Sequence, residues 1–395
     1  MNRPSLSFKT ILIRCAAALG LLGALSCTDH KPGGTTLYVF DDTSKTVMVW
    51  ADINAVYNAV TGSTAVAGPD RTIGSNLLGS VHLAWGGLAV DSSANVLYLV
   101  SESGTVYAIY SANTQNSTTL SQTNQIISYN LGLSTDRFPQ GSWFGQAAVD
   151  SSTGVLYVTE NAQGGQSNTG TRIWKIAGPS SYVLNGVTLT PPSQYTIGVA
   201  SDTNGAGLAA GLGGDVFALC GGGNNISDLL ENTYSGPRLR YGTQGSFPQP
   251  VGSLNSQVII GPNTGFYRGL TTGSLGYDPQ NSAVYVFTPV NSPNAVLVFN
   301  KSQFATGTYN VAPARTLAVG DANLGSLQVI SHPSNSDWMV GATIASGTAS
   351  STSSGDGAGS VIIWKSPSGG PVPSVSATMP GTGLEIRGLA IGGNG

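Results

Sequence analysis

Gly87-Leu-Ala-Val-Asp91 is the stretch that decides the fold, and Tyr98 follows its Asp seven positions later. The phrase returns as Gln146-Ala-Ala-Val-Asp150, with Tyr157 again seven positions after the Asp. Weaker copies of the phrase are centred on Gly211, Asp278, His332 and Gly392. A self-similar period of this size indicates an array of like structural units, each too small to bury its apolar face alone.

The composition suits units made of short strands and tight turns. Charged residues make up only 9% of the chain and Gly numbers 54, while the formal net charge is −3. These values argue against a helical protein and against a nucleic-acid binder with a basic face. The 40% of hydrophobic residues is enough for a core, which argues against wholesale disorder.

Each unit has the same internal order of four short apolar strands, which we name A to D. In the best-preserved unit they are expected at 87–91, 96–100, 105–110 and 125–129, with turn residues between them. Four short strands per unit are typical of a β-propeller blade. The third unit departs most, because Gly211 replaces the Asp and 221–256 reads as a long insertion without a clear strand C.

The two ends of the domain complement each other. Residues 36–40, 46–50 and 70–73 read as strands B, C and D without a strand A, whereas 387–391 reads as a strand A alone. Joining them assembles one blade from both termini and leaves no free sheet edge in the ring. The sequence therefore predicts an all-β, six-bladed β-propeller over residues 35–395, with its last blade closed by strands from both termini.

The first 26 residues are predicted to be a signal peptide. Three positive charges, Arg3, Lys9 and Arg14, precede an apolar stretch at 15–25 that is too short to span a bilayer. Ala24-Leu-Ser-Cys27 then resembles a bacterial lipobox, which implies lipidation of Cys27 and a short polar tether over 27–34. The alternative is an ordinary secretory signal with an incidental Cys. Because Thr28 is not Asp, we expect a lipid anchor in the outer membrane or at the cell surface.

The repeated phrases resemble bacterial NHL-type repeat propellers and, more loosely, the six-bladed gluconolactonase-like superfamily. The resemblance is carried by Gly87–Asp91 with Tyr98, by Gln146–Asp150 with Leu156–Asn161, and by the paired Arg-Thr-Ile/Leu strands at 71–73 and 315–317. It covers nearly all of 35–395. It implies the fold more strongly than any activity.

In a propeller the D–A and B–C connections emerge on one face, which we call the mouth face, and this face is the expected ligand site. Arg beside aromatic residues is conspicuous there, since rings stack on sugar or peptide faces and Arg supplies forked donors. Alternatively, the rings pack between blades and the Arg side chains bond loop carbonyls. The candidate ligand-binding residues are Trp85, Trp143, Arg268, Arg387 and His82.

The resemblance to gluconolactonase-like enzymes implies a channel metal such as Ca²⁺, held by Glu and by Asn or Asp oxygens. Glu160 and Asn161 are the nearest candidate pair, although such residues also end strands and form side-chain turns. The full ligand set is not legible, so no cofactor is predicted. This reading leaves one alternative function, a metal-dependent lactonase or esterase-like hydrolase with its site in the central channel.

Catalytic machinery of other kinds is also not legible. Asp91, Asp150 and Asp278 each open a short A–B turn and are expected to accept backbone N–H bonds there. Cys220 lies within an apolar strand and reads as a core residue. We therefore expect a membrane-anchored, extracytoplasmic binding or scaffold module for a protein or glycan partner, with no nucleic-acid partner and no catalytic residue.

Overall fold

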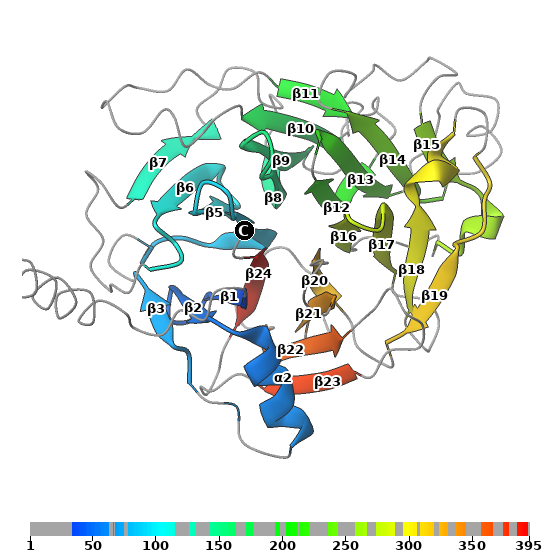
Figure 1. Cartoon of the computed structure of the whole chain (residues 1–395). Coiled ribbons are helices and arrows are strands. Elements are labelled where there is room, and N and C mark those ends of the chain that lie inside the picture. Colours follow the sequence, from blue (N-terminus) through cyan, green and yellow to red (C-terminus); the bar gives the residue numbers. More distant parts are fainter. Residues whose placement is uncertain are drawn as a thin grey trace, which may run out of the picture.

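The computed structural model describes 20 segments of the chain (Figure 1). They are 34–62, 66, 68–74, 78–114, 126–131, 142–162, 171–176, 194–197, 203–211, 213–221, 236–243, 257–266, 274–288, 295–305, 309–319, 324–330, 337–344, 357–365, 374–378 and 385–393. Arg268 and Cys27, which the sequence singles out, lie outside the described residues.

The described strands form six four-stranded antiparallel sheets, and in each of them the first strand named is the innermost. The first sheet contains β24 (Ile386–Gly393), β1 (Thr35–Asp41), β2 (Thr46–Trp50) and β3 (Arg71–Ile73). The second contains β4 (Leu83–Asp91), β5 (Val96–Ser101), β6 (Thr105–Tyr110) and β7 (Ile126–Asn130). The third contains β8 (Ser142–Asp150), β9 (Val155–Ala162), β10 (Thr171–Ile176) and β11 (Gln194–Ile197).

The remaining three sheets repeat this order. The fourth contains β12 (Thr203–Gly211), β13 (Asp215–Gly221), β14 (Arg238–Thr243) and β15 (Gln257–Ile260). The fifth contains β16 (Ser274–Asp278), β17 (Ala283–Thr288), β18 (Ala295–Asn300) and β19 (Arg315–Ala318). The sixth contains β20 (Leu324–Ile330), β21 (Trp338–Ile344), β22 (Gly357–Lys365) and β23 (Ser374–Thr378).

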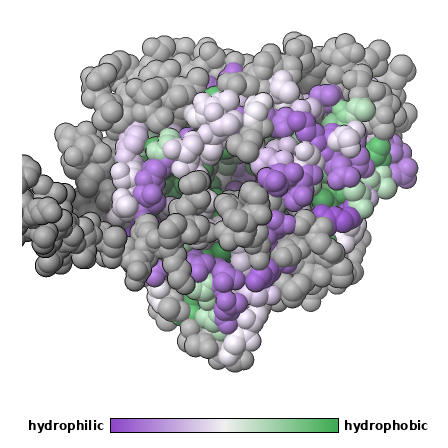
Figure 2. All heavy atoms as spheres, viewed as in Figure 1, coloured by the Kyte–Doolittle hydropathy of each residue, from purple (hydrophilic) through white to green (hydrophobic). Residues whose placement is uncertain are grey.

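The sheets are set around a common centre, as in a β-propeller (Figure 1). The innermost strands contact one another in the order β24, β4, β8, β12, β16 and β20, and β20 contacts β24 again. The predicted all-β fold of antiparallel sheets is confirmed. In the view of Figure 2 the described surface is largely hydrophilic, and hydrophobic residues show mainly in its recesses.

Strand β1 shows why such strands are apolar along their whole length. Leu37 and Val39 pack in a core cluster with Trp338 of the sixth sheet, whereas Tyr38 and Phe40 pack in a cluster with residues of the second sheet. Both faces of the strand are therefore buried between neighbouring sheets. A near-continuous run of apolar residues is the expected pattern for a strand covered on both sides.

The first sheet joins residues from the two ends of the domain. β24 pairs antiparallel with β1 from Thr35 with Gly393 to Asp41 with Ile386, and Tyr38 lies opposite Ala390. Strands predicted at 36–40 and 387–391 therefore do meet. The turns between strands A and B lie at the ends of the sheets opposite the mouth face, and we call this side the turn face. Because β1 starts beside the end of β24, residue 34 lies at the turn face.

One α-helix was not predicted. α2 (Ile53–Thr61) begins at Asp52, whose side chain accepts a 2.9 Å hydrogen bond from the Asn54 N–H, the usual N-cap arrangement. It buries Ile53, Val56 and Tyr57 and contacts β23 of the adjacent sheet (Figure 1). Two short 3₁₀ helices complete the described elements, η3 (Pro262–Thr264) and η4 (Lys301–Phe304).

The interpretation of 221–256 as an insertion without a strand C was wrong. β14 runs through it at Arg238–Thr243 and pairs with β13 and β15. Arg238 and Arg240 are both buried, with exposed fractions of 0% and 6%. Two charged residues at buried positions hide the apolar alternation by which a strand is recognised in sequence.

Candidate functional site at the mouth face

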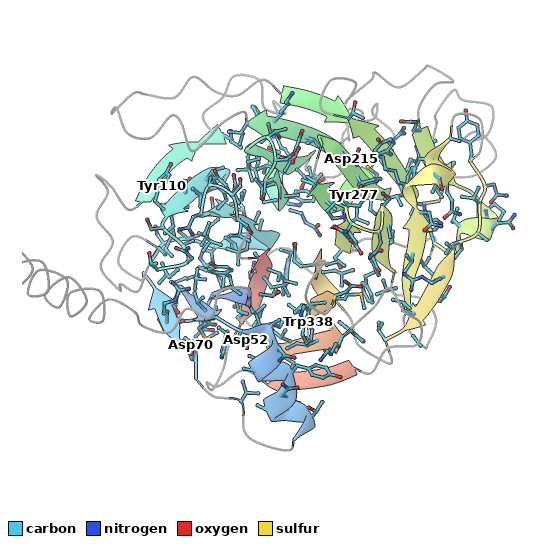
Figure 3. The ribbon with its side chains drawn as sticks, in the orientation of Figure 1. Asp52, Asp70, Tyr110, Asp215, Tyr277 and Trp338 are labelled. Atoms are coloured by element: carbon cyan, nitrogen blue, oxygen red, sulfur yellow. The ribbon has the colours of Figure 1, made fainter. Side chains whose placement is uncertain are left out.

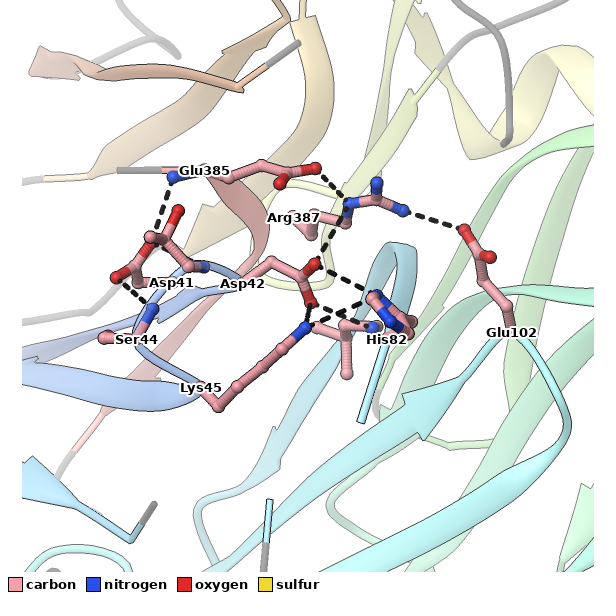
Figure 4. Close-up of polar contacts among 10 residues, drawn as sticks. Asp41, Asp42, Ser44, Lys45, His82, Glu102, Glu385 and Arg387 are labelled. Atoms are coloured by element: carbon pink, nitrogen blue, oxygen red, sulfur yellow. Dashed lines mark hydrogen bonds and ion pairs between the residues drawn. The ribbon is translucent and has the colours of Figure 1, made fainter. Parts of the chain in front are cut away.

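A cluster of charged side chains, which we call the mouth cluster, gathers at the mouth face where the first and second sheets meet (Figure 4). It is built from the end of β1, the start of β4, the end of β5 and the start of β24. All four strand ends point to the same side because successive strands are antiparallel. The members are Asp41, Asp42, Lys45, His82, Trp85, Glu102, Glu385 and Arg387.

Arg387 is the centre of the cluster and is only 4% exposed. Its Nε donates to Glu385 Oε1 at 2.7 Å, and its Nη1 donates to Glu102 Oε1 at 2.8 Å (Figure 4). The guanidinium carbon lies 5.4 Å from the centre of the Trp85 ring, within cation–π range. Burial opposes the charge of Arg387, but the bond to Glu385 and the nearby carboxylates raise its pKa overall. Two of its nitrogens are thus committed to the protein's own carboxylates.

Asp42 links the buried centre to the exposed rim. Its Oδ1 lies 2.8 Å from Lys45 Nζ, and its Oδ2 lies 3.4 Å from His82 Nδ1 and 3.9 Å from Arg387 Nε. The His82 side chain is 63% exposed, so it is open to solvent at the edge of the cluster. Asp41 is instead structural, because its Oδ1 accepts a 2.9 Å hydrogen bond from the backbone N–H of Glu385.

Glu102 is the carboxyl of the cluster whose charge is disfavoured. Burial raises the pKa of Glu102 above its usual range, and Arg387 and His82 offset only part of this effect. A carboxyl with a raised pKa in the folded state contributes stability below its ordinary pKa of about 4.3, and this contribution is lost as the pH rises. The ionised form of Glu102 is therefore held at a cost at neutral pH.

We expect the Glu102→Gln variant to gain stability relative to the parent as the pH rises from about 4 to 7. Gln keeps the shape and loses the charge, so the pH-dependent loss disappears. Urea unfolding at pH 4, 5.5 and 7 measures this difference. Ser103→Ala, a neighbouring change without a titrating group, should shift stability equally at all three values. A Gln variant that becomes progressively less stable than the parent towards pH 7 contradicts the prediction.

The structure brings together three of the five predicted ligand-binding residues, His82, Trp85 and Arg387. Trp143 lies on β8 of the third sheet and is half-buried, and its neighbour Phe144 donates a 3.0 Å backbone hydrogen bond to the carbonyl of Glu102. Trp143 is therefore at the same face but on the adjoining sheet. Arg268 lies outside the described residues and is not placed.

Of the candidate metal-binding pair, Glu160 is engaged in hydrogen bonds within the protein, and Asn161 beside it is buried. Glu160 is fully buried, and its two oxygens accept hydrogen bonds from Ser142 Oγ at 2.5 Å and from Trp174 Nε1 at 2.9 Å. Oxygens occupied in this way are not open to a hard cation. Among the described residues no group of three or more His, Cys, Asp and Glu side chains is placed to hold a metal ion.

The recurring Asp residues act as turn formers on the turn face, as predicted. Asp91 Oδ1 accepts from the backbone N–H groups of Ser93 and Ala94, each at 3.0 Å. Asp150 reaches further, because its Oδ2 accepts a 2.8 Å hydrogen bond from Gly214 N–H of the next sheet. Asp278 bonds Asn281 within its own turn. These carboxylates hold turns and join neighbouring sheets, far from the mouth face.

A second polar cluster, centred on Asp215, was missed. Asp215 is 4% exposed and lies close to Tyr277 (Figure 3). It accepts hydrogen bonds from Tyr241 OH at 2.9 Å, Tyr277 OH at 2.8 Å and Lys301 Nζ at 2.7 Å. Burial and the hydrogen bond to Asp215 both raise the pKa of Tyr277.

Gly211 makes this arrangement possible. A Cβ at that position would lie 2.2 Å from the Tyr277 ring, so only Gly lets the ring pass over β12. In this fourth sheet, which is the third repeat counted from Asp91, the turn carboxylate is that of Asp215, which pairs with Gly211 across the turn. The replacement of the repeated Asp by Gly211 was the one feature of the sequence that could have pointed to the Asp215 cluster. Cys220 is buried in the core, as expected.

Comparisons with known proteins give weak structural likenesses only. Neither the comparison with family profiles nor that with curated proteins gives a match. Hydrazine synthase of Kuenenia stuttgartiensis has a TM-score of 0.39 and 11% identity, over 75% of this chain and 68% of that one. The PQQ-bound aldose sugar dehydrogenase of Streptomyces coelicolor has a TM-score of 0.36 and 14% identity, over 77% and 96%. Likeness at this level does not bear on activity. No helix within the described residues is long and apolar enough to cross a membrane.

Proposed function

We propose that this chain is an exported, lipid-anchored propeller of six blades that binds a glycan at its mouth face without catalysing a reaction. The blade count and ring closure are supported by the six four-stranded sheets and by the pairing of β24 with β1. Export and anchoring are supported by the charged and apolar leader and by the Cys27 motif.

One observation carries the binding proposal: in the described mouth cluster, carboxylate groups outnumber the strong cations. The carboxyl groups of Asp42, Glu102 and Glu385 face only two strong cations, Arg387 and Lys45, among the residues that the structure describes. Ionised carboxylates only accept hydrogen bonds, so a ligand rich in hydroxyl donors complements them. Half-buried Trp85 adds an amphipathic ring of the kind that stacks on sugars. The negative surplus disfavours polyanions such as nucleic acids.

We expect Trp85→Ala to weaken glycan binding by at least tenfold, equivalent to about 1.4 kcal/mol. His82→Ala should weaken binding less, because its side chain is mostly exposed. Tyr110→Ala is the matched control. Tyr110 is also half-buried, but it lies at the end of β6 that is away from the mouth face. A glycan array with the soluble 35–395 chain, followed by calorimetry on the best ligand, measures these affinities.

Two outcomes would redirect the assignment. If no glycan binds but a protein partner is retained by the parent and lost by the Trp85 variant, the site is right and the ligand class is wrong. If dialysed protein keeps a stoichiometric divalent ion and hydrolyses members of a lactone panel, the alternative of a metal-dependent lactonase or esterase-like hydrolase replaces the binding role. Equal glycan affinity in all variants removes the site from consideration.

A further inference from the structure

A cavity of about 270 Å³ opens at the turn face, at the end of the molecule opposite the mouth cluster. All six innermost strands contribute to its wall. In ring order, they contribute among others Val90, Ala148, Ala210, Gly276, Val329 and Ile391. The side chains are small and apolar, which leaves a narrow space along the axis where six strands converge.

Polar groups interrupt this lining at Gln328 of β20 and near the turns. Ser92 and Ser151 belong to A–B turns and also line the cavity. A mainly apolar wall with a few polar groups is the usual character of a small-molecule site. The volume lies just below the range of about 300–1,000 Å³ typical of such sites, so it suits one slender apolar group.

The start of the domain lies beside this opening. Thr35, the first residue of β1, pairs with Gly393 of β24, and Gly393 itself lines the cavity. Neighbouring strands are only about 4.8 Å apart, so the chain enters the fold at the cavity rim. Cys27 precedes Thr35 by eight residues. A tether of that length spans at most about 28 Å, which is ample to bring Cys27 back to the opening.

We propose that the cavity holds one alkyl chain of the lipid carried by Cys27. This proposal rests on the lipidation of Cys27, which is part of the proposed function, but not on glycan binding at the mouth. Burial in the apolar channel removes hydrocarbon from water, which is the dominant favourable contribution to such association. The turn face then points towards the membrane, and the mouth cluster points away from it.

The test compares lipidated full-length protein in phosphatidylcholine nanodiscs with the unlipidated Cys27→Ser chain, using lauric acid as the probe. The Ser chain, with an empty cavity, is expected to bind laurate one to one. The lipidated protein is expected to bind it at least tenfold more weakly, because its own alkyl chain competes. Ala148→Leu and Ala210→Leu, both at half-buried lining positions, should weaken laurate binding to the Ser chain at least tenfold.

Ala94→Leu is the matched control, because it makes the same change at an exposed turn position that does not line the cavity. Equal laurate binding by the lipidated and Ser chains would show that the cavity takes free lipid, and would overturn the proposal. Absence of laurate binding by the Ser chain, or a mass spectrum showing unmodified Cys27, would also overturn it. The comparison of the two chains needs no cavity variant, so a misfolded Leu variant does not affect it. Glycan binding by the soluble chain is measured separately, so the two failures are distinguishable.

Discussion

Replacing Asp215 with Ala is expected to lower the free energy of unfolding by about 3 kcal/mol, the upper end of the cost of leaving a buried hydrogen-bond donor unsatisfied, because more than one donor loses its acceptor. The change removes the acceptor of three hydrogen-bond donors at once: the hydroxyls of Tyr241 and Tyr277 and the ammonium of Lys301. Tyr277 and Lys301 belong to the fifth sheet and the 3₁₀ helix that follows its third strand, whereas Asp215 belongs to the fourth sheet. The variant should therefore loosen the junction between two sheets.

Urea unfolding followed by Trp fluorescence measures this loss. Tyr277→Phe removes a single hydrogen bond and should cost about 1 kcal/mol. Asp70→Ala is the matched control, because Asp70 is exposed and accepts one 2.7 Å hydrogen bond from Ala51 N–H. It should cost no more than about 1.5 kcal/mol. If Asp215→Ala costs as little as this control, Asp215 does not hold the junction.

Removing residues 386–393 is expected to abolish cooperative unfolding altogether. The deletion takes away β24, exposes one edge of β1 along its length, and removes Leu389, which is fully buried in the core shared by the first and sixth sheets. Leu389→Ala alone should cost about 2–5 kcal/mol. Loss of the whole strand is therefore expected to remove most of the free energy of unfolding, which is roughly 5–15 kcal/mol for a typical domain.

Hydrogen exchange reports this effect locally, and truncation after Gly393 is the control. The control keeps β24 and should retain protection of the amides of β1 that bond to it. In the 386–393 deletion, the β1 amides should exchange rapidly even at low temperature. Unchanged protection in β1 together with an unchanged urea transition would mean that the pairing with β24 contributes nothing to the fold.

The strand pattern could be predicted because each blade repeats one local rule. The alternation of short apolar segments and turn residues predicted the strands around Tyr98 and Tyr157. The complementary chain ends predicted that residues near Tyr38 and Leu389 would meet. α2 could not be predicted from repetition, since no other described part of the chain carries such a helix. Its signals were local and brief: a capping Asp52 followed by apolar residues at helical spacing.

The candidate site was predictable in place but not in chemistry. Topology alone put His82, Trp85 and Arg387 on one face, because connections of the same type emerge together. The commitment of Arg387 to Glu385 and Glu102 depends on side-chain packing, which no spacing in the sequence encodes. The Asp215 cluster lies further beyond sequence reasoning, because its donors come from separate strands and a 3₁₀ helix.

The shared sheet also fixes an order of events in biogenesis. Of the described strands β1 is synthesised first and its inner partner β24 last, so the sheet stays incomplete until all the other described strands exist. Contacts so distant in sequence slow folding, and an unpaired strand edge invites association with other chains. We therefore expect newly made protein to depend on chaperones that shield this edge, and nascent chains that still lack Ile386–Gly393 to be the form most prone to aggregate.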